Sequence, residues 1–391
     1  MLEALEGSLA IARAVSLCKP DVVAAYPITP QTHIVENLSK LVAEGDLHTE
    51  FVSVESEFSA ASVVLGAAAT GARAYTATAS QGVLLMSEVL FNIAGMRVPL
   101  VMTVANRAVG APLSIWNDHS DSMAVRDSGW IQLHCTDNQE AVDTTIQAFR
   151  IAQDTELPVM VCVDGFILTH TLEPIDLPTQ DAVDGWLPPF EFARSLDPSA
   201  PKSLGTLVTP DYFAEVRHSH QSAMVKSLDA IELADRDWQA LTGRASGGLL
   251  TVEGDLDAKV GILAMGSTVG TLQEGMAGAS AEVGTARLIK LRAFRPFPTA
   301  ALREACKGLD HLIVIDRAIS PGLGGIVGTE VAAALYGTDN PPRIHNHAIG
   351  LGGRDIPESI FADLMASIAD PDAPAFSIFD ADMAKLPAED R

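Results

Sequence analysis

The sequence has few of the residues that hold metal clusters. It contains four cysteines in 391 residues, and no two of them form a Cys-x-x-Cys pair. Zinc and iron–sulfur sites need cysteines at short, repeated spacings, so we expect no such site within this chain. The simplest expectation is that Cys18, Cys135, Cys162 and Cys306 are small core residues.

Basic residues are also scarce. Lys and Arg total 26 against 50 Asp and Glu, which gives a formal net charge of −24. This excess of negative charge repels phosphate backbones, so we expect no general binding of nucleic acid. Solubility is the simplest explanation of the acidity, and attraction to a basic protein partner is the alternative.

Long apolar runs and a basic N-terminus are both missing. No apolar run approaches the ~20 residues that cross a bilayer. Residues 1–6 read MLEALE, with acids where a signal peptide carries bases. We therefore expect a cytoplasmic protein with no membrane span. The sequence also lacks the G-x-S-x-G pattern of a serine nucleophile.

Apolar strand patterns alternate with helical ones along the chain. Residues 74–78, 99–104 and 159–163 are short runs that are apolar on both faces, which predicts buried strands. Apolar residues at helical spacing predict helices at residues 2–17 and 208–243. The alternation predicts an α/β fold with a mostly parallel sheet covered on both sides.

Composition divides the chain into parts. We expect one domain over residues 1–240, with an irregular Pro- and Asp-rich connector at about 171–205. A second alternating pattern predicts another α/β domain over residues 250–370. Residues 371–391 are rich in Pro, Asp and Ala and are expected to form a surface tail or docking arm.

The first polar constellation follows an apolar run that ends at Tyr26. Thr29 stands where an N-cap residue belongs, and Pro30 stands at the first helical position. Capping alone is one interpretation. The other is ligand binding, because open parallel sheets bind ligands at the carboxyl ends of strands, and a helix N-terminus favours an anion such as a carboxylate.

Two carboxylates, Glu55 and Glu57, follow the next predicted strand. A Glu near a helix start is ordinarily a surface residue that complements the helix dipole. However, residues 60–69 are too apolar to form a solvated face. A partly buried Glu at the mouth of this helix, with raised proton affinity, is therefore the alternative interpretation.

Arg107 directly follows the apolar strand at residues 99–104. Its guanidinium is a fork suited to binding a carboxylate, or alternatively to a salt bridge at the rim of the sheet. Asp118, His119 and Asp121 lie in one loop without a known metal-ligand spacing, which indicates a polar turn. The glycine-rich loops also indicate tight turns, because the one at residues 321–328 fails the full dinucleotide pattern.

Taken together, these segments resemble the alpha subunit of the pyruvate:ferredoxin (2-oxoacid:acceptor) oxidoreductase family. The similarity spans nearly the whole chain in order. The segments that carry it are residues 26–30, 54–60, 76–82, 105–108, 115–121, 164–166, 294–298 and 350–355. The resemblance implies a pyrimidine-binding domain of the thiamine-diphosphate type, followed by a domain like the C-terminal domain of transketolase.

The resemblance also implies roles for individual residues. Glu57 would hydrogen-bond the N1′ nitrogen of thiamine diphosphate, and Thr29 and Arg107 would hold the substrate carboxylate. The other expected cofactor contacts are Pro27, Ile28, Ser80 and Gln81. The implied reaction is oxidative decarboxylation of a 2-oxoacid, with pyruvate the best guess, to acyl-CoA and CO2, with coenzyme A as co-substrate and ferredoxin or a similar protein as electron acceptor.

Two absences imply partner chains. The chain lacks a complete Gly-Asp-Gly segment with the Asn that thiamine enzymes use to hold magnesium and diphosphate, and it lacks cluster cysteines. A beta subunit would supply the Mg2+ and diphosphate site, a gamma subunit and a delta-type iron–sulfur subunit would be further partners, and the 4Fe-4S clusters would lie in partner subunits. The isolated chain would then be inactive.

Other interpretations remain open at the level of sequence. The same chemistry could act on phenylglyoxylate, a branched-chain 2-oxoacid or 2-oxoglutarate. A non-catalytic docking subunit is a second alternative, and the placement of Thr29, Glu57 and Arg107 at three strand ends argues against it. A nucleotide-binding regulatory protein, suggested only by the glycine loops, ranks last.

Overall fold

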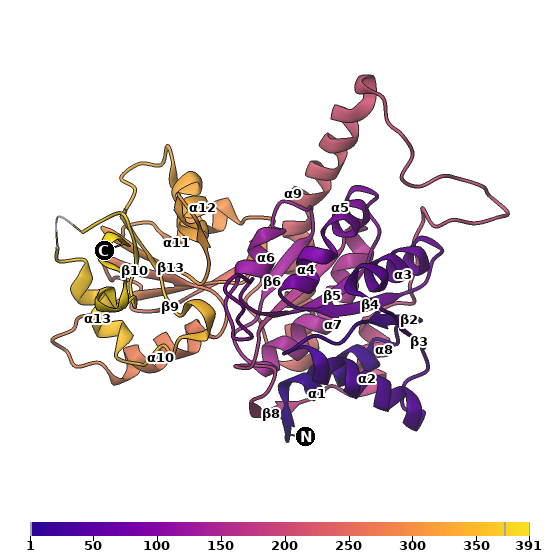
Figure 1. The fold of residues 1–391 in the computed structure, drawn as a ribbon, viewed down its shortest axis with the longest axis horizontal. Coiled ribbons are helices and arrows are strands. Elements are labelled where there is room, and N and C mark those ends of the chain that lie inside the picture. The colour runs from indigo at the N-terminus through magenta and orange to yellow at the C-terminus, as the bar shows by residue number, and fades with distance from the viewer. Residues whose placement is uncertain (1, 371–372, 391) are drawn as a thin grey trace. The chain divides into compact units, whose positions relative to one another are not determined.

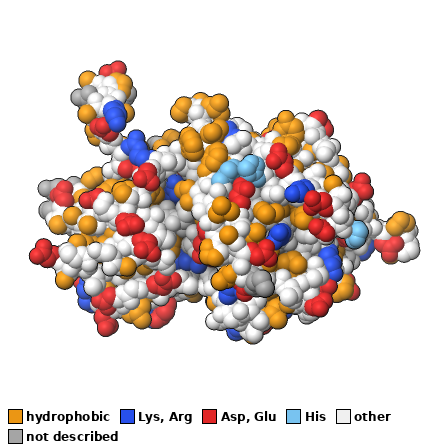
Figure 2. All heavy atoms as spheres, turned by 90° about the horizontal axis from the view of Figure 1, so that it is seen from below, with side chains coloured by type: hydrophobic (Ala, Val, Ile, Leu, Met, Phe, Trp, Pro, Cys, Tyr) orange, Lys and Arg blue, Asp and Glu red, His pale blue; other side chains and the backbone are white. Residues whose placement is uncertain are grey.

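The computed structural model describes residues 2–370 and 373–390 and divides the chain into two compact units. The first unit comprises Met1–Thr251 and Leu291–Pro298, and the second comprises Val252–Lys290 and Thr299–Arg391. Within the described residues, no helix is both long and apolar enough to cross a membrane. Acidic side chains are spread over the face drawn in Figure 2 rather than gathered in one patch.

A seven-stranded sheet forms the centre of the first unit. Its strands are β2 (Val22–Ala25), β3 (Glu50–Ser53), β4 (Ala74–Thr78), β5 (Val101–Asn106), β6 (Ile131–His134), β7 (Val159–Asp164) and β12 (Ala293–Arg295). They lie in the order β12-β6-β7-β5-β4-β2-β3, and every pairing is parallel except that of β12 with β6. Strands β4, β5 and β7 are buried at every position, because helices cover both faces. The predicted parallel sheet is confirmed.

Helices cover the two faces of this sheet (Figure 1). One layer contains α1 (Gly7–Leu17), α2 (Thr32–Glu44) and α7 (Asn138–Thr155), and the other contains α3 (Glu57–Ala69), α4 (Gln81–Leu85) and α5 (Ser87–Gly95). The predicted helix at 208–243 is α9 (Pro210–Thr242), which packs on α7. All four cysteines are free and buried, as expected.

Two local predictions were wrong. Residues 2–17 do not form one helix, because Leu2–Glu6 is a strand, β1, that pairs antiparallel with β8 (Leu172–Asp176). The partner strand lies far away in the sequence, so helical spacing gives no sign of it. The connector at 171–205 contains β8 and the helix α8 (Gln180–Trp186), whose Trp186 packs edge-on against Trp238 with ring centroids 5.0 Å apart.

The second unit is built on a six-stranded sheet. Its strands are β9 (Leu250–Gly254), β10 (Val260–Ala264), β11 (Arg287–Leu291), β13 (His311–Asp316), β16 (Arg343–Ala348) and β17 (Phe376–Ile378), in the order β17-β16-β13-β10-β11-β9. Its helices are α10 (Thr268–Gly278), α11 (Thr299–Ala305), α12 (Ile326–Leu335) and α13 (Ile360–Ser367). The segment expected to be a tail thus contributes β17, which pairs parallel with β16. Residues 371, 372 and 391 of that segment lie outside the described residues.

The glycine loop at 321–328 is a tight turn, as predicted. Strands β14 (Ile319–Ser320) and β15 (Gly324–Gly325) form a short antiparallel pair there. The buried Asp316 carboxylate accepts hydrogen bonds from Val327 N (2.7 Å) and Gly328 N (3.0 Å) at the start of α12. The chain's own carboxylate therefore satisfies the free N–H groups at this helix N-terminus, where an anion could otherwise bind.

Candidate active site

The topology of the first sheet marks one edge for ligand binding. Strands β2 and β4 are neighbours, but the chain leaves β2 through α2 toward β3 on one side and leaves β4 through α4 and α5 toward β5 on the other. In open parallel sheets, a crevice forms at the carboxyl ends of strands where the direction of winding changes in this way. Every predicted site residue follows the carboxyl end of β2, β3, β4 or β5.

Thr29 lies in the segment after β2, ahead of the helix. Helix α2 begins at Thr32 with Gln31 at the N-cap position, so the prediction that Thr29 caps the helix was wrong. The segment is instead fixed by the buried Gln31 side chain, whose Nε2 donates to Ala77 O (2.7 Å) and whose Oε1 accepts from Ile28 N (3.2 Å). These bonds tie the end of β2 to β4 and leave the Thr29 side chain exposed.

Arg107 reaches the same segment from the end of β5. Its Nη1 donates to Thr29 O (2.9 Å) and its Nε to Ser114 O (2.8 Å), while the residue is only 7% exposed. Within residues 2–370 and 373–390, Arg107 forms no ion pair and Nη2 has no hydrogen-bond partner, which argues against the rim salt bridge. Burial lowers the pKa of Arg107, and the Asp121 charge opposes this shift. The guanidinium is thus oriented by backbone carbonyls, with donors left for an anion.

Asp121 is a site residue that the sequence analysis missed. The loop expected to be a polar turn is buried, and Asp121 is 0% exposed. One carboxylate oxygen accepts from Ser80 N (2.8 Å) and Arg107 N (3.0 Å), and the other accepts from Asn106 Nδ2 (2.7 Å) and Ser122 N (2.8 Å). Burial raises the pKa of Asp121 to about 6, although these bonds oppose the shift. No sequence signal separates this Asp from its neighbours, because its partners come from distant strand ends.

The same loop contains a second buried pair. His119 Nε2 lies 2.7 Å from Asp164 Oδ1 at the end of β7, and both side chains are 1% exposed. The His134 ring lies next to the His119 ring, with the two ring centroids 5.0 Å apart. Burial, and then the neighbouring His119, lower the pKa of His134 to about 3. These contacts fix the loop against the sheet.

Glu57 is the first residue of α3. The Ser56 hydroxyl caps this helix by accepting from Ser59 N, and the Glu57 side chain is 7% exposed. Among the described residues, none forms a hydrogen bond or ion pair with the Glu57 carboxylate. A Cβ added at Gly82 would lie 2.9 Å from Glu57 Oε1 and 2.3 Å from Thr78 Oγ1, so only glycine fits beside this carboxylate. A buried carboxylate that meets no protein donor is suited to a ligand that supplies one.

Glu55 has the opposite environment. It is exposed, and its carboxylate accepts a hydrogen bond from the Ser59 hydroxyl, which is the largest cause of a lowered pKa for Glu55. Glu55 therefore behaves as a surface carboxylate, whereas Glu57 faces the interior.

The remaining predicted residues differ in their accessibility. Ser80 is buried with φ of 47°, in the left-handed region that few non-glycine residues adopt, and its hydroxyl donates to Ala108 O (2.7 Å). Gln81 and Ile28 are half-buried, and Pro27 is exposed. Hydrogen bonds through Asp121 and Ala108 join the ends of β4 and β5, and Arg107 joins β5 to β2.

Sequence comparisons identify the relatives of this chain. Residues 13–236 match the family described as "Pyruvate flavodoxin/ferredoxin oxidoreductase, thiamine diP-bdg", and residues 258–359 match "Pyruvate:ferredoxin oxidoreductase core domain II". The chain is 48% identical to pyruvate synthase subunit PorA of Methanosarcina barkeri, over 91% of this chain and 90% of that protein. It is 39% identical to ketoisovalerate oxidoreductase subunit VorA of Pyrococcus abyssi, over 90% and 89%.

Solved structures share the fold. A 2-oxoglutarate:ferredoxin oxidoreductase from Magnetococcus marinus superposes with a TM-score of 0.71 at 20% identity over 93% of this chain. This chain spans 64% of that longer chain, less than two thirds of its length. A split-gene transketolase superposes with a TM-score of 0.55 at 13% identity, over 93% of this chain and 98% of that one. By the matched family domains and the extent of identity to pyruvate synthase subunits, the chain belongs to the pyruvate:ferredoxin oxidoreductase family, as its ordered motifs predicted.

Proposed function

We propose that this chain is the alpha subunit of a pyruvate:ferredoxin oxidoreductase and forms the pyrimidine-binding half of its thiamine-diphosphate site. The observation that carries the proposal is Glu57, a buried carboxylate at the carboxyl edge of the sheet with no hydrogen-bond or ion-pair partner among residues 2–370 and 373–390. It lies within residues 13–236, which match a family described as thiamine-diphosphate-binding. Residues 1–240 would be the pyrimidine-binding domain, and residues 250–370 the transketolase C-terminal-like domain.

The residues present fit this cofactor. The Glu57 carboxylate would accept or share a proton at N1′ of the aminopyrimidine, and the missing side chain of Gly82 permits the close approach of the chain that holds this carboxylate in place. Pro27, Ile28, Ser80 and Gln81 would line the cofactor. When bound, thiamine diphosphate supplies the carbon nucleophile and electron sink that decarboxylation of a 2-oxoacid requires.

Arg107 and Thr29 would hold the substrate carboxylate. The Nη2 group of Arg107 has no hydrogen-bond partner in the described part of the chain, and the Thr29 side chain is exposed beside it. Because Nε and Nη1 are already bonded to carbonyls, the guanidinium needs little reorganisation when an anion arrives.

Partner chains would complete the enzyme. The relatives are named as subunits of pyruvate synthase, and we propose that a beta subunit supplies the Mg2+ and diphosphate site. A gamma subunit and a delta-type iron–sulfur subunit would be further partners, and 4Fe-4S clusters in partner subunits would pass electrons to ferredoxin or another acceptor. Coenzyme A would accept the acyl group, and the assembly would be cytoplasmic. The overall oxidation would release two electrons, and each iron–sulfur cluster would carry one at a time, which is why such partners are needed.

The test is a purified complex captured through this chain. We expect broad visible absorption from iron–sulfur clusters, and the highest kcat/KM with pyruvate in a panel that includes 2-oxoglutarate, phenylglyoxylate and a branched-chain 2-oxoacid. The fold similarity to the 2-oxoglutarate enzyme and the 39% identity to the ketoisovalerate subunit make those substrates the informative competitors. Preference for any of them would replace pyruvate in the proposal, and a complex without thiamine-dependent activity would overturn it.

A further inference from the structure

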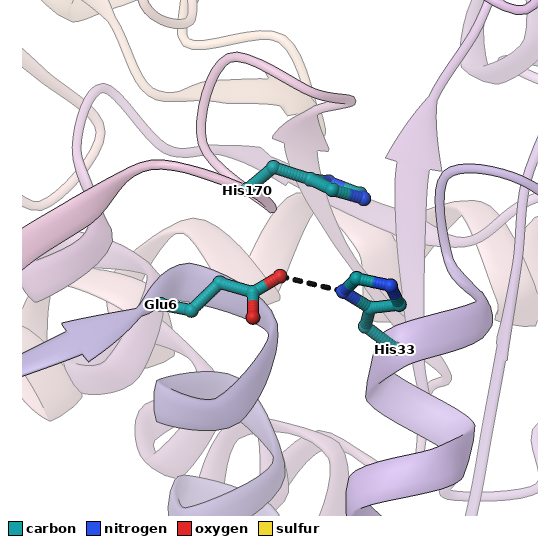
Figure 3. A group of neighbouring side chains, drawn as sticks. All are labelled: Glu6, His33 and His170. Atoms are coloured by element: carbon teal, nitrogen blue, oxygen red, sulfur yellow. Dashed lines mark hydrogen bonds and ion pairs between the residues drawn. The ribbon is translucent and has the colours of Figure 1, made fainter.

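Three potential metal ligands gather outside the proposed active site: Glu6, His33 and His170. One carboxylate oxygen of Glu6 and one nitrogen of each imidazole lie within 4.8 Å of one another. Figure 3 shows the three side chains facing one another from separate segments of the chain.

The pairing of β1 with β8 brings Glu6 and His170 together. In the antiparallel register Glu6 lies opposite Leu172, two residues beyond His170. Gly7 N donates to Thr171 O (3.1 Å), and a Cβ at Gly7 would lie only 2.1 Å from Leu168 O. Glycine at this position therefore permits the close approach that places the carboxylate beside the imidazole.

His33 enters from the first turn of α2, which packs on α1. Its Nδ1 lies 2.6 Å from Glu6 Oε1, and its ring centroid lies 4.6 Å from that of His170. His170 is held by a second contact, because its Nδ1 lies 2.7 Å from the hydroxyl of the buried Thr169. A hydrogen bond to one imidazole nitrogen orients the other toward a ligand, which is how metal-binding histidines are commonly fixed.

We propose that Glu6, His33 and His170 form a binding site for one divalent transition-metal ion of the zinc class. Two imidazoles and a carboxylate suit Zn2+, Co2+ or Ni2+, whereas Mg2+ prefers oxygen ligands and water. The ligands of this site therefore differ from those of the Mg2+ site that we propose for the beta subunit. Three protein ligands leave a fourth position for water in a tetrahedral site.

The side chains can close on an ion. Zinc–ligand bonds of about 2.0–2.2 Å require the donor atoms to approach more closely than 4.8 Å. The Glu6 and His33 side chains are 30% and 45% exposed, so small rotations meet little resistance from packing. The ion would join β1, α2 and the segment after β7, three parts of the first unit that lie apart in sequence.

Packed side chains connect the proposed metal site to the candidate active site. The Phe166 ring lies 4.8 Å from the ring of His170 and 4.8 Å from that of Trp116, whose carbonyl accepts from Ala108 N (2.9 Å). The metal would thus stabilise the framework beside Arg107 without contacting the substrate. An ion that binds only the folded chain raises its melting temperature by mass action.

The test uses the full-length chain, free of any affinity tag and stripped with a chelator. We expect titration with Zn2+ to raise Tm and saturate at one ion per chain, and Co2+ to give the visible absorption of a tetrahedral nitrogen–oxygen site. His33→Gln and His170→Gln should each weaken Zn2+ binding by a factor on the order of 10–100 or more. His48→Gln, at an exposed histidine outside the cluster, is the matched control and should bind as the wild type does.

Circular dichroism of each variant checks that the fold survives. If His170→Gln proves unstable, Glu6→Gln decides the question, because it keeps a hydrogen bond to His33 but removes the charged ligand. The proposal is overturned if the wild type shows no saturable binding at one ion per chain. It is equally overturned if well-folded variants at all three positions bind Zn2+ as tightly as the wild type.

Discussion

Arg107 Nη1 donates a 2.9 Å hydrogen bond to the carbonyl oxygen of Thr29, so the two residues proposed to hold the substrate carboxylate are joined before any substrate arrives. The bond connects the ends of β5 and β2 across β4. It also explains why the guanidinium holds one orientation although it forms no ion pair with the described residues. The site therefore needs little rearrangement to receive an anion.

Arg107→Ala should raise KM for pyruvate much more than it weakens binding of the cofactor. The lost interaction is a charged hydrogen bond, which contributes roughly 1.5–3 kcal/mol, so KM should rise about 10- to 100-fold. Steady-state kinetics on the assembled complex measure this change. Arg126→Ala is the control, since that residue lies outside the proposed contacts, and unchanged kinetics for Arg107→Ala would reduce it to a structural residue.

Glu57→Gln should preserve fold and assembly and slow turnover by a factor on the order of 10²–10⁴, the usual span for a lost acid–base group. Glutamine keeps the shape but cannot exchange a proton with N1′. Glu55→Gln is the internal control, because Glu55 is exposed and bonded to Ser59. Hydrogen–deuterium exchange at C2 of the bound cofactor reports the step directly. If Glu55→Gln slowed turnover strongly and Glu57→Gln did not, the proposed roles of the two residues would be reversed.

Asp121→Asn should displace the site residues that Asp121 positions, while leaving the groups that take part in the chemical step unchanged. Each carboxylate oxygen of Asp121 accepts two hydrogen bonds, so an amide in either orientation sets its NH2 group against two donors. Each unsatisfied buried donor costs about 1–3 kcal/mol, which should lower Tm and raise KM for pyruvate more than it lowers kcat. Asp127→Asn, at an exposed aspartate of the same region, should change neither quantity. A wild-type KM in Asp121→Asn would show that Asp121 does not position Arg107.

His134 should make the protein less stable as pH falls below about 6.5. Burial depresses its pKa to about 3 in the folded chain, so only the unfolded chain gains a proton between these pH values. The stability of the neutral form is complete above the unfolded pKa and decreases by up to about 1.4 kcal/mol per pH unit below it. Since the chain's pI is about 4.6, urea unfolding is best compared between pH 5.5 and 7.5.

His134→Leu removes the titrating ring and should flatten this part of the pH profile. His48→Gln should leave the slope unchanged, because that histidine is exposed. Identical slopes for wild type and His134→Leu would show that His134 does not govern the acid sensitivity.

Local patterns in the sequence predicted much of the fold. Runs that are apolar on both faces predicted the buried strands β4, β5 and β7, and apolar helical spacing predicted α9. These features follow from neighbouring residues, since period and polarity act over a few positions. The apolar residues after Glu57 left open a partly buried Glu at the start of the helix, but local pattern did not separate Glu57, which is buried, from Glu55, which is exposed.

Only the tertiary structure decided which distant segments meet. The pairing of β1 with β8, the four bonds to Asp121 and the cluster of Glu6, His33 and His170 each join residues from separate parts of the chain. The register of strand pairs and the shared edge at the ends of parallel strands bring these residues together. Neither feature can be recognised from the local composition of the sequence. The sequence by itself therefore determined the layers and the polarity of each segment. The folded chain determined which polar groups became partners, because a buried donor or acceptor is satisfied by whatever packing brings beside it.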